Sequence, residues 1–225
     1  MSLLRTLGLA ALALAAATPT LADPASTPPP DQAAGVDVFV SSDADHTDVS
    51  KAALSFDWRR AGPEQYDGIR METARFRPLG QAATSDQRIY YRFADKGRDW
   101  AWSGQVGTDG HTALGSFDVH NGARFRQEYF LEREIVETPQ GVSRRIYYTF
   151  AGGAVDLPAG DRDMFTVTGA VQDFTGRNMR LHLRGTYVHT LKADWGLTAQ
   201  VRARYFHSSE PGQFDYFSPR NFVQV

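Results

Sequence analysis

Residues 195–205 read WGLTAQVRARY, an alternation of apolar residues with glycine, polar or charged residues. A period of two is typical of a β-strand, because successive side chains point to opposite faces of a sheet. One face of this strand would be apolar, with Trp195 and Tyr205 at its ends, and the other would carry Arg202 and Arg204. This pattern predicts a strand in the wall of an outer-membrane β-barrel.

The overall composition is compatible with such a barrel. The 225 residues are 42% hydrophobic and 12% aromatic, with a mean hydropathy of -0.40 and no cysteine. Barrel strands interleave polar residues with lipid-facing ones, so a negative mean hydropathy does not argue against a membrane location. The net charge of -2 predicts no nucleic-acid partner. The absence of cysteine excludes a disulfide scaffold and a thiol enzyme.

The N-terminus has the pattern of a processed export signal. Arg5 precedes an apolar core at residues 7–17, and the small-x-small run 20–22 predicts cleavage after Ala22 and export through the Sec pathway. A membrane anchor is disfavoured because the apolar run is short and ends at Pro19. The expected parts are a signal peptide, a proline-rich linker and a β-barrel, over residues 1–22, 23–34 and 35–225.

Beyond the linker, the sequence predicts an all-β, antiparallel meander barrel of about twelve strands and no helix. Turn signals such as Asn121-Gly122 and Asp109-Gly110 separate apolar-alternating runs. The expected strands cover residues 36–41, 51–59, 68–78, 87–94, 99–107, 111–119, 123–138, 142–151, 163–173, 178–191, 195–207 and 217–225.

Charged residues gather on one face of several predicted strands. If Leu181 and Leu183 face lipid, the charged residues that alternate with them face the interior of the barrel. A dry core would have to pair nearly every one of these charges, so they predict a polar lumen that binds polar, hydroxyl-rich or ionic solutes. The alternative is an internal salt-bridge plug that holds a narrow barrel together. The lumen candidates are Arg180, His182, Arg184, Arg202, Arg204, Arg124, Arg126 and Glu128, with Glu132 and Glu134 on the same face.

The C-terminal region reads HSSEPG at residues 207–212 and YFSPRNF at residues 216–222. This segment resembles YaiO-type outer-membrane β-barrels, relatives of the barrel domains of the outer-membrane component of cellulose synthase and of the poly-N-acetylglucosamine export porin. The resemblance implies a passive channel or an accessory in polysaccharide export, with outer-membrane lipid, polysaccharide and inner-membrane synthase components as partners. It implies no enzyme activity and identifies no catalytic residue, and we expect no metal or cofactor. The matching residues are His207, Ser208, Tyr216, Phe217, Ser218 and Pro219.

Outer-membrane barrels usually end on an aromatic residue, whereas this sequence ends on Val225. The sequence is therefore also compatible with a truncated copy of a longer barrel.

Two other classes remain open from the sequence. An outer-membrane lipid-modifying enzyme would use Ser208 with His189 as its base, since His207 points to the opposite face from Ser208. A soluble periplasmic lipocalin-like barrel would reverse the orientation, with apolar residues facing a closed cavity. Aromatic residues at strand ends favour lipid contact instead. These are Trp58, Trp100, Trp102, Tyr187, Trp195 and Tyr205.

The sequence offers weak metal-binding patterns. Asp43, Asp45, His46 and Asp48 crowd one turn, but no glycine bend or closing glutamate accompanies them. We therefore expect a solvated acidic turn and no metal site.

Overall fold

The computed structural model describes residues 32–42, 48–61, 64–77, 79–122, 125–176, 178–210 and 220–225. Twelve strands in these ranges form one sheet in which every ladder is antiparallel and the spatial order follows the chain. The prediction of an all-β antiparallel meander is confirmed. The strands are β1 (Gln32–Ser42), β2 (Asp48–Arg59), β3 (Tyr66–Arg77), β4 (Thr84–Lys96), β5 (Trp100–Thr108), β6 (Ala113–Asn121), β7 (Gln127–Ile135), β8 (Tyr147–Pro158), β9 (Asp163–Phe174), β10 (Asn178–Lys192), β11 (Leu197–Ser208) and β12 (Asn221–Gln224).

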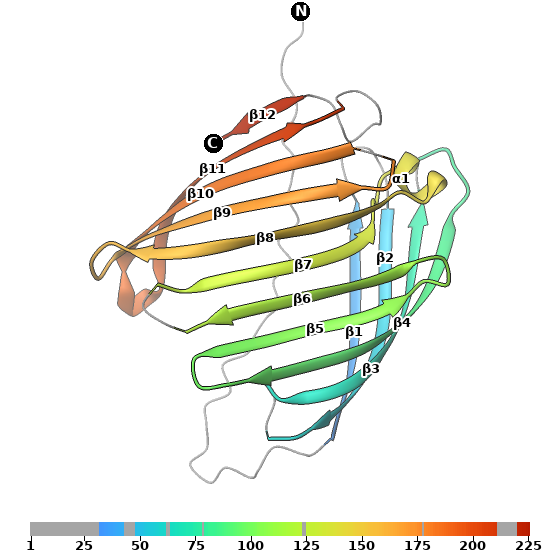
Figure 1. Ribbon diagram of the computed structural model, residues 1–225, viewed down its shortest axis with the longest axis horizontal. Coiled ribbons are helices and arrows are strands. Elements are labelled where there is room, and N and C mark those ends of the chain that lie inside the picture. The colour runs from blue at the N-terminus through green and yellow to red at the C-terminus, as the bar shows by residue number, and fades with distance from the viewer. Residues whose placement is uncertain are drawn as a thin grey trace, which may run out of the picture.

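The sheet is strongly curled and open. In Figure 1, β5 to β12 lie side by side as one wall, and β1 and β2 cross behind it at a steep angle. Among the described strands, β1 pairs only with β2 and β12 only with β11, so these two strands are the edges of the sheet. The closed barrel expected from the sequence is therefore not formed by the described strands alone.

Alternation gives the sheet an inner and an outer face. On β2, Val49, Ala53 and Ser55 are buried on the concave inner face, whereas Leu54 and Trp58 on the outer face are 56% and 43% exposed. Strand register carries this division to the neighbouring strands, because directly opposed residues share a face. We call these two surfaces the inner face and the outer face.

Two helical segments contradict the expectation of no helix. A short α-helix, α1 (Pro139–Arg144), occupies the break between the strands predicted at residues 123–138 and 142–151, and the first residues of the second strand. Its start is fixed by Thr138, whose side chain accepts a hydrogen bond from the Gly141 N–H, as N-cap residues do. The 3-10 helix η1 (Ala193–Trp195) ends at Gly196 with φ 62°, so the strand predicted from Trp195 begins at Leu197 instead.

Within the described part of the chain, no helix has the length and apolar character needed to cross a membrane.

Strand boundaries also differ from those expected. β1 begins at Gln32, inside the segment expected as linker, and β7 begins at Gln127 rather than at residue 123. The residues expected as signal peptide, and residues 23–31, lie outside the described part.

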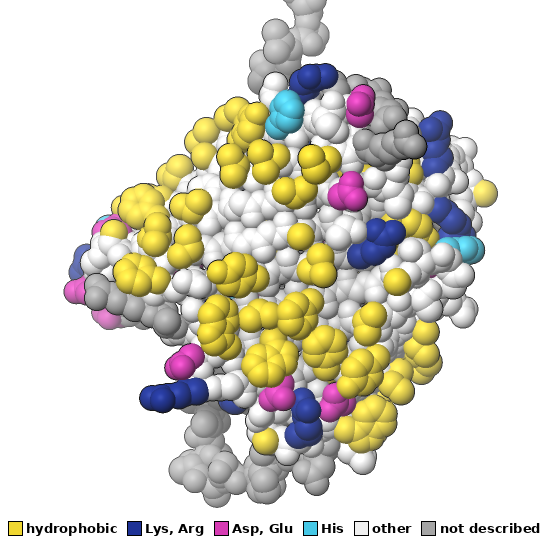
Figure 2. Space-filling view, in the orientation of Figure 1, with side chains coloured by type: hydrophobic (Ala, Val, Ile, Leu, Met, Phe, Trp, Pro, Cys, Tyr) yellow, Lys and Arg dark blue, Asp and Glu magenta, His cyan; other side chains and the backbone are white. Residues whose placement is uncertain are grey.

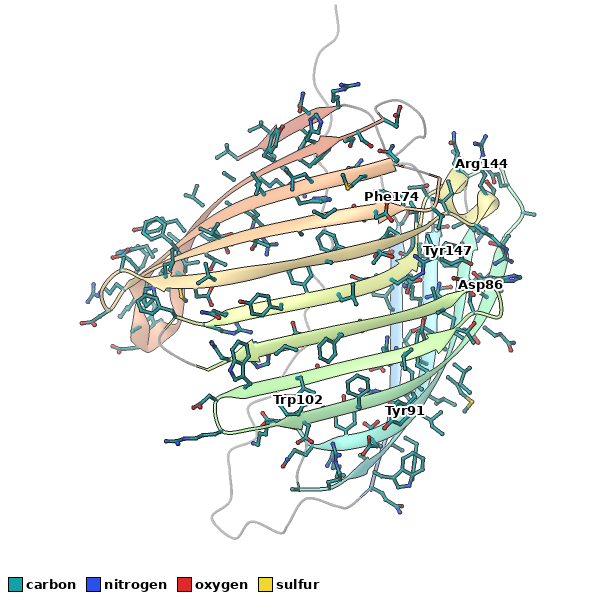
Figure 3. The ribbon with its side chains drawn as sticks, in the orientation of Figure 1. Asp86, Tyr91, Trp102, Arg144, Tyr147 and Phe174 are labelled. Atoms are coloured by element: carbon teal, nitrogen blue, oxygen red, sulfur yellow. The ribbon has the colours of Figure 1, made fainter. Side chains whose placement is uncertain are left out.

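A small apolar core occupies the end of the sheet where α1 lies. Figure 3 shows Tyr147 and Asp86 at this end, close to the helix. Apolar side chains from six strands and the helix pack together there, which anchors α1 to the sheet. The cluster contains Val49, Ala74, Phe76, Tyr90, Leu114, Ile135, Val142 and Tyr147.

Candidate functional site

The inner face of β10 and β11 carries most of the cationic residues singled out from the sequence. Arg184 lies directly opposite Arg204, and Arg202 lies opposite Thr186. Arg180 and His182 occupy the same face of β10 because they are separated from Arg184 by even numbers of residues. The structure therefore brings these five residues onto one continuous surface.

Of the lumen candidates near the start of β7, the structure places one within the strand itself. Glu128 lies on the inner face, opposite His120 of β6. Arg126 precedes the strand, and its guanidinium lies 3.3 Å from the Glu128 carboxylate and 4.0 Å from that of Asp156. Arg124 lies outside the described residues.

A buried ionic network lies on the inner face of β3, β4 and β7. Arg88 Nη1 is 3.1 Å from Glu72 Oε1 and 3.0 Å from Glu134 Oε2, and the Arg88 side chain is fully buried. Glu72 also contacts Arg70 at 3.1 Å, and Arg70 pairs with Asp37 of β1. Charges from four strands thus stabilise one another inside the curl.

A cavity of about 390 Å³ adjoins this network. It is lined by residues of β2 and of β7 to β10, so it lies within the curl. Lys51 Nζ lies 2.6 Å from Glu137 Oε1, and the Tyr148 hydroxyl donates to Glu132 Oε1 at 2.9 Å. Carboxylate, ammonium, hydroxyl and amide groups all reach the cavity, so its wall can hydrogen-bond a polar solute.

Two polar contacts stabilise the end of the sheet where α1 lies. Arg145 Nη1 lies 3.4 Å from Asp86 Oδ1, and the Tyr147 hydroxyl donates to Asp109 Oδ2 at 2.6 Å. Burial alone raises the pKa of Asp109, but donation by Tyr147 and by the backbone N–H groups of Thr112 and His111 outweighs it. The net effect is a lowered pKa, so Asp109 holds this turn as a carboxylate.

Sequence reasoning singled out Glu134 but missed its partner Arg88 and the second carboxylate that pairs with Arg88, Glu72. A signal was present, because Arg70, Glu72 and Arg88 alternate with apolar residues in two predicted strands. Alternation shows that such residues share a face, but it does not show which distant strand they contact.

The pair needed for a lipid hydrolase is not brought together. Ser208 lies on the inner face opposite Arg180, and its hydroxyl accepts a hydrogen bond from Arg180 Nε at 3.1 Å. His189 lies on the outer face near the other end of the β10–β11 ladder, with Nδ1 2.7 Å from Asp163 Oδ1. Ser208 therefore has no access to a base at His189.

The remaining motif residues give little further geometry. His207 Nδ1 lies 2.8 Å from Asn221 Oδ1. Tyr216, Phe217, Ser218 and Pro219 lie outside the described residues, as do residues 43–47 of the acidic turn. Over the described ranges, no three His, Asp or Glu side chains lie close enough to hold one metal ion.

No protein-family model, curated protein or solved structure matches the chain.

Proposed function

We propose that this chain forms the wall of an outer-membrane β-barrel whose polar interior acts as a passive channel, or as an accessory in exopolymer export. The observation that carries the proposal is the apolar outer face. Every strand of the sheet exposes at least one large apolar side chain there, such as Leu54 at 56%, Leu183 at 48% and Val201 at 56%. Soluble proteins rarely expose a continuous apolar surface of this extent, and lipid would cover it.

The distribution of side chains over the outer face supports the same proposal. In Figure 2, hydrophobic side chains spread over much of the visible face, and charged side chains gather mostly toward its margins. This arrangement fits an apolar band between two polar rims. A lipocalin-like binder would need the reverse orientation, with the apolar face turned inward.

Aromatic residues mark one end of the outer face. Trp58 packs against Phe56 at 4.9 Å, and Phe165 packs against Tyr187 at 4.8 Å between ring centroids. Trp100 and Trp195 lie at the same end, where β5 begins and where η1 precedes β11. Aromatic rings at this level suit the boundary between lipid and water.

The opposite end carries the longer connection between β7 and β8, which contains α1. Outer-membrane barrels have short periplasmic turns and longer extracellular loops. We therefore assign the aromatic end to the periplasm and the α1 end to the exterior.

A second candidate function is favoured by the ionic network. Arg88 joins β4 to β7 across the curl, and such bridges narrow an interior. On this reading, the charges form a plug that stabilises a closed barrel, and no solute passes.

One experiment tests both candidates. The protein purified from an outer-membrane fraction would be run on a denaturing gel with and without boiling, and then reconstituted in planar lipid bilayers. A heat-dependent shift with stepwise potassium chloride conductance is expected for the channel. A shift without conductance would support the plug. Folded protein found only in the periplasmic soluble fraction would contradict the membrane proposal.

A further inference from the structure

Five partly buried rings form a continuous row on the inner face from β7 to β12. Neighbouring ring centroids are 5.2, 5.3, 6.1 and 5.1 Å apart. The row is held in place by the register, which sets His182 opposite Phe206 and Phe206 opposite Phe222, and by contact of His182 Nε2 with Gln172 Oε1 at 3.1 Å. Its members are Phe130, Phe150, His182, Phe206 and Phe222.

Arginine side chains lie along this row. The guanidinium of Arg180 is 4.4 Å from the ring centroid of Phe206, and that of Arg204 is 5.6 Å from the ring centroid of Phe222. Arg184 lies opposite Arg204 and donates to the Thr168 hydroxyl at 3.3 Å. Guanidinium groups beside aromatic faces are held flat by the cation–π interaction and keep their outer N–H groups available.

On this part of the inner face, the described strands offer no carboxylate of their own to pair with Arg184, Arg202 and Arg204. The inner positions of β9 to β12 include no Asp or Glu, whereas the carboxylates of the inner face belong to β1 to β8. Arg184, Arg202 and Arg204 are exposed, and none of the ion pairs among the described residues involves them. Like charges directly opposite each other on a sheet destabilise it. An anionic ligand would offset that cost.

We propose that this arginine–aromatic row, made of the five rings with Arg184, Arg202 and Arg204, binds an acidic saccharide chain. The sugar rings pack against the exposed parts of the aromatic side chains, and the uronate carboxylates pair with the guanidinium groups, which match carboxylate geometry. The proposal rests on the proposed function, because a solute reaches the inner face of a membrane barrel only through its interior.

Neutral polar groups favour a saccharide over a nucleic acid. Thr168, Thr186, Gln172 and Gln200 share the inner face with the row and offer hydroxyl and amide groups to sugar hydroxyls. The carboxylates on β1 to β8 would repel a densely charged polyphosphate chain, whereas a uronate chain carries fewer charges among many hydroxyl groups.

The test is calorimetric titration of the full chain, refolded in detergent micelles, with oligogalacturonate. The variants are Arg184→Gln, Arg204→Gln and Phe206→Leu, with Arg59→Gln as a matched control on β2. We expect binding of oligogalacturonate and none of a neutral maltodextrin. Each arginine variant should weaken the affinity about tenfold, as loss of one charge-assisted hydrogen bond does. Phe206→Leu should also weaken it, and the control should not.

The proposal would be overturned by equal affinity for maltodextrin, by equal affinity for oligothymidylate, by unchanged oligogalacturonate binding in all three row variants, or by no binding of oligogalacturonate. Circular dichroism and the heat-dependent gel shift would confirm that each variant folds. Because binding is measured in micelles, the outcome is separate from the membrane proposal. Protein that inserts into bilayers and conducts but binds no oligogalacturonate would sink this inference alone.

Discussion

Arg88 Nη1 lies 3.0 Å from Glu134 Oε2, although β5 and β6 separate their strands in the sheet. Three strand spacings would place β4 and β7 about 14 Å apart in a flat sheet. The ion pair therefore spans the concavity of the curl, and the same guanidinium also holds Glu72 on the adjacent strand. One buried cation thus fixes the local curvature.

Replacing this cation should destabilise the fold. Arg88→Met leaves Glu72 and Glu134 buried without their shared partner, and the free energy of unfolding should fall by about 3 kcal/mol. The measurement is urea unfolding in micelles, followed by tryptophan fluorescence. Arg77→Met, at the exposed end of β3, is the matched control and should change little. The triple variant with Glu72→Gln and Glu134→Gln should recover part of the loss. An Arg88→Met protein as stable as the control would contradict the network's role.

The two faces of β11 should respond oppositely to added charge. Val201→Arg puts a cation on the outer face, and in a bilayer it should cost about 2 to 4 kcal/mol near the midplane. Gln200→Arg puts the same side chain on the inner face and should cost far less. Folding yield into liposomes, read from the heat-dependent gel shift, compares the two. Equal yields for both variants would mean that lipid does not cover the outer face.

The Asp109–Tyr147 contact should make stability depend on pH. The pKa of Asp109 is lower in the folded state than its ordinary value of 3.8, so its contribution is fully present above that value. The contribution is lost as the pH falls through the folded pKa. Urea midpoints measured from neutral pH downward should fall more steeply for the wild type than for Asp109→Asn.

Tyr147→Phe separates the side-chain contribution from the backbone one. It removes the hydroxyl donor and leaves the backbone donors of His111 and Thr112 in place. Its pH dependence should therefore lie between those of the wild type and Asp109→Asn. Identical acid profiles for all three proteins would rule out this contact as a source of the pH dependence.

The strands could be predicted from sequence because their signal is local. The alternation of apolar and polar side chains can be recognised from consecutive residues, as at 197–205. The register of each strand then follows from the strands next to it. Helix α1 could not be found this way, since it has six residues and depends on the Thr138 cap and on packing of Val142. Contacts between strands on opposite sides of the curl could not be predicted from the sequence either. The pairs of Lys51 with Glu137 and of Arg88 with Glu134 depend on curvature, which alternation does not encode.

Curvature also depends on a close approach at Gly107. A Cβ at this position would lie 1.9 Å from the Ile89 carbonyl oxygen and 2.6 Å from Tyr90 Cδ1, so the β4–β5 ladder would have to shift. Gly107→Ala should lower the free energy of unfolding by about 2 kcal/mol, as overpacking does. Gly185 of β10 is the matched control, because a Cβ there meets nothing within 4 Å. Gly185→Ala should be neutral or slightly stabilising, since alanine loses less backbone entropy on folding. Urea unfolding in micelles compares the two, and equal losses would show that the close approach to β4 does not account for the glycine at position 107.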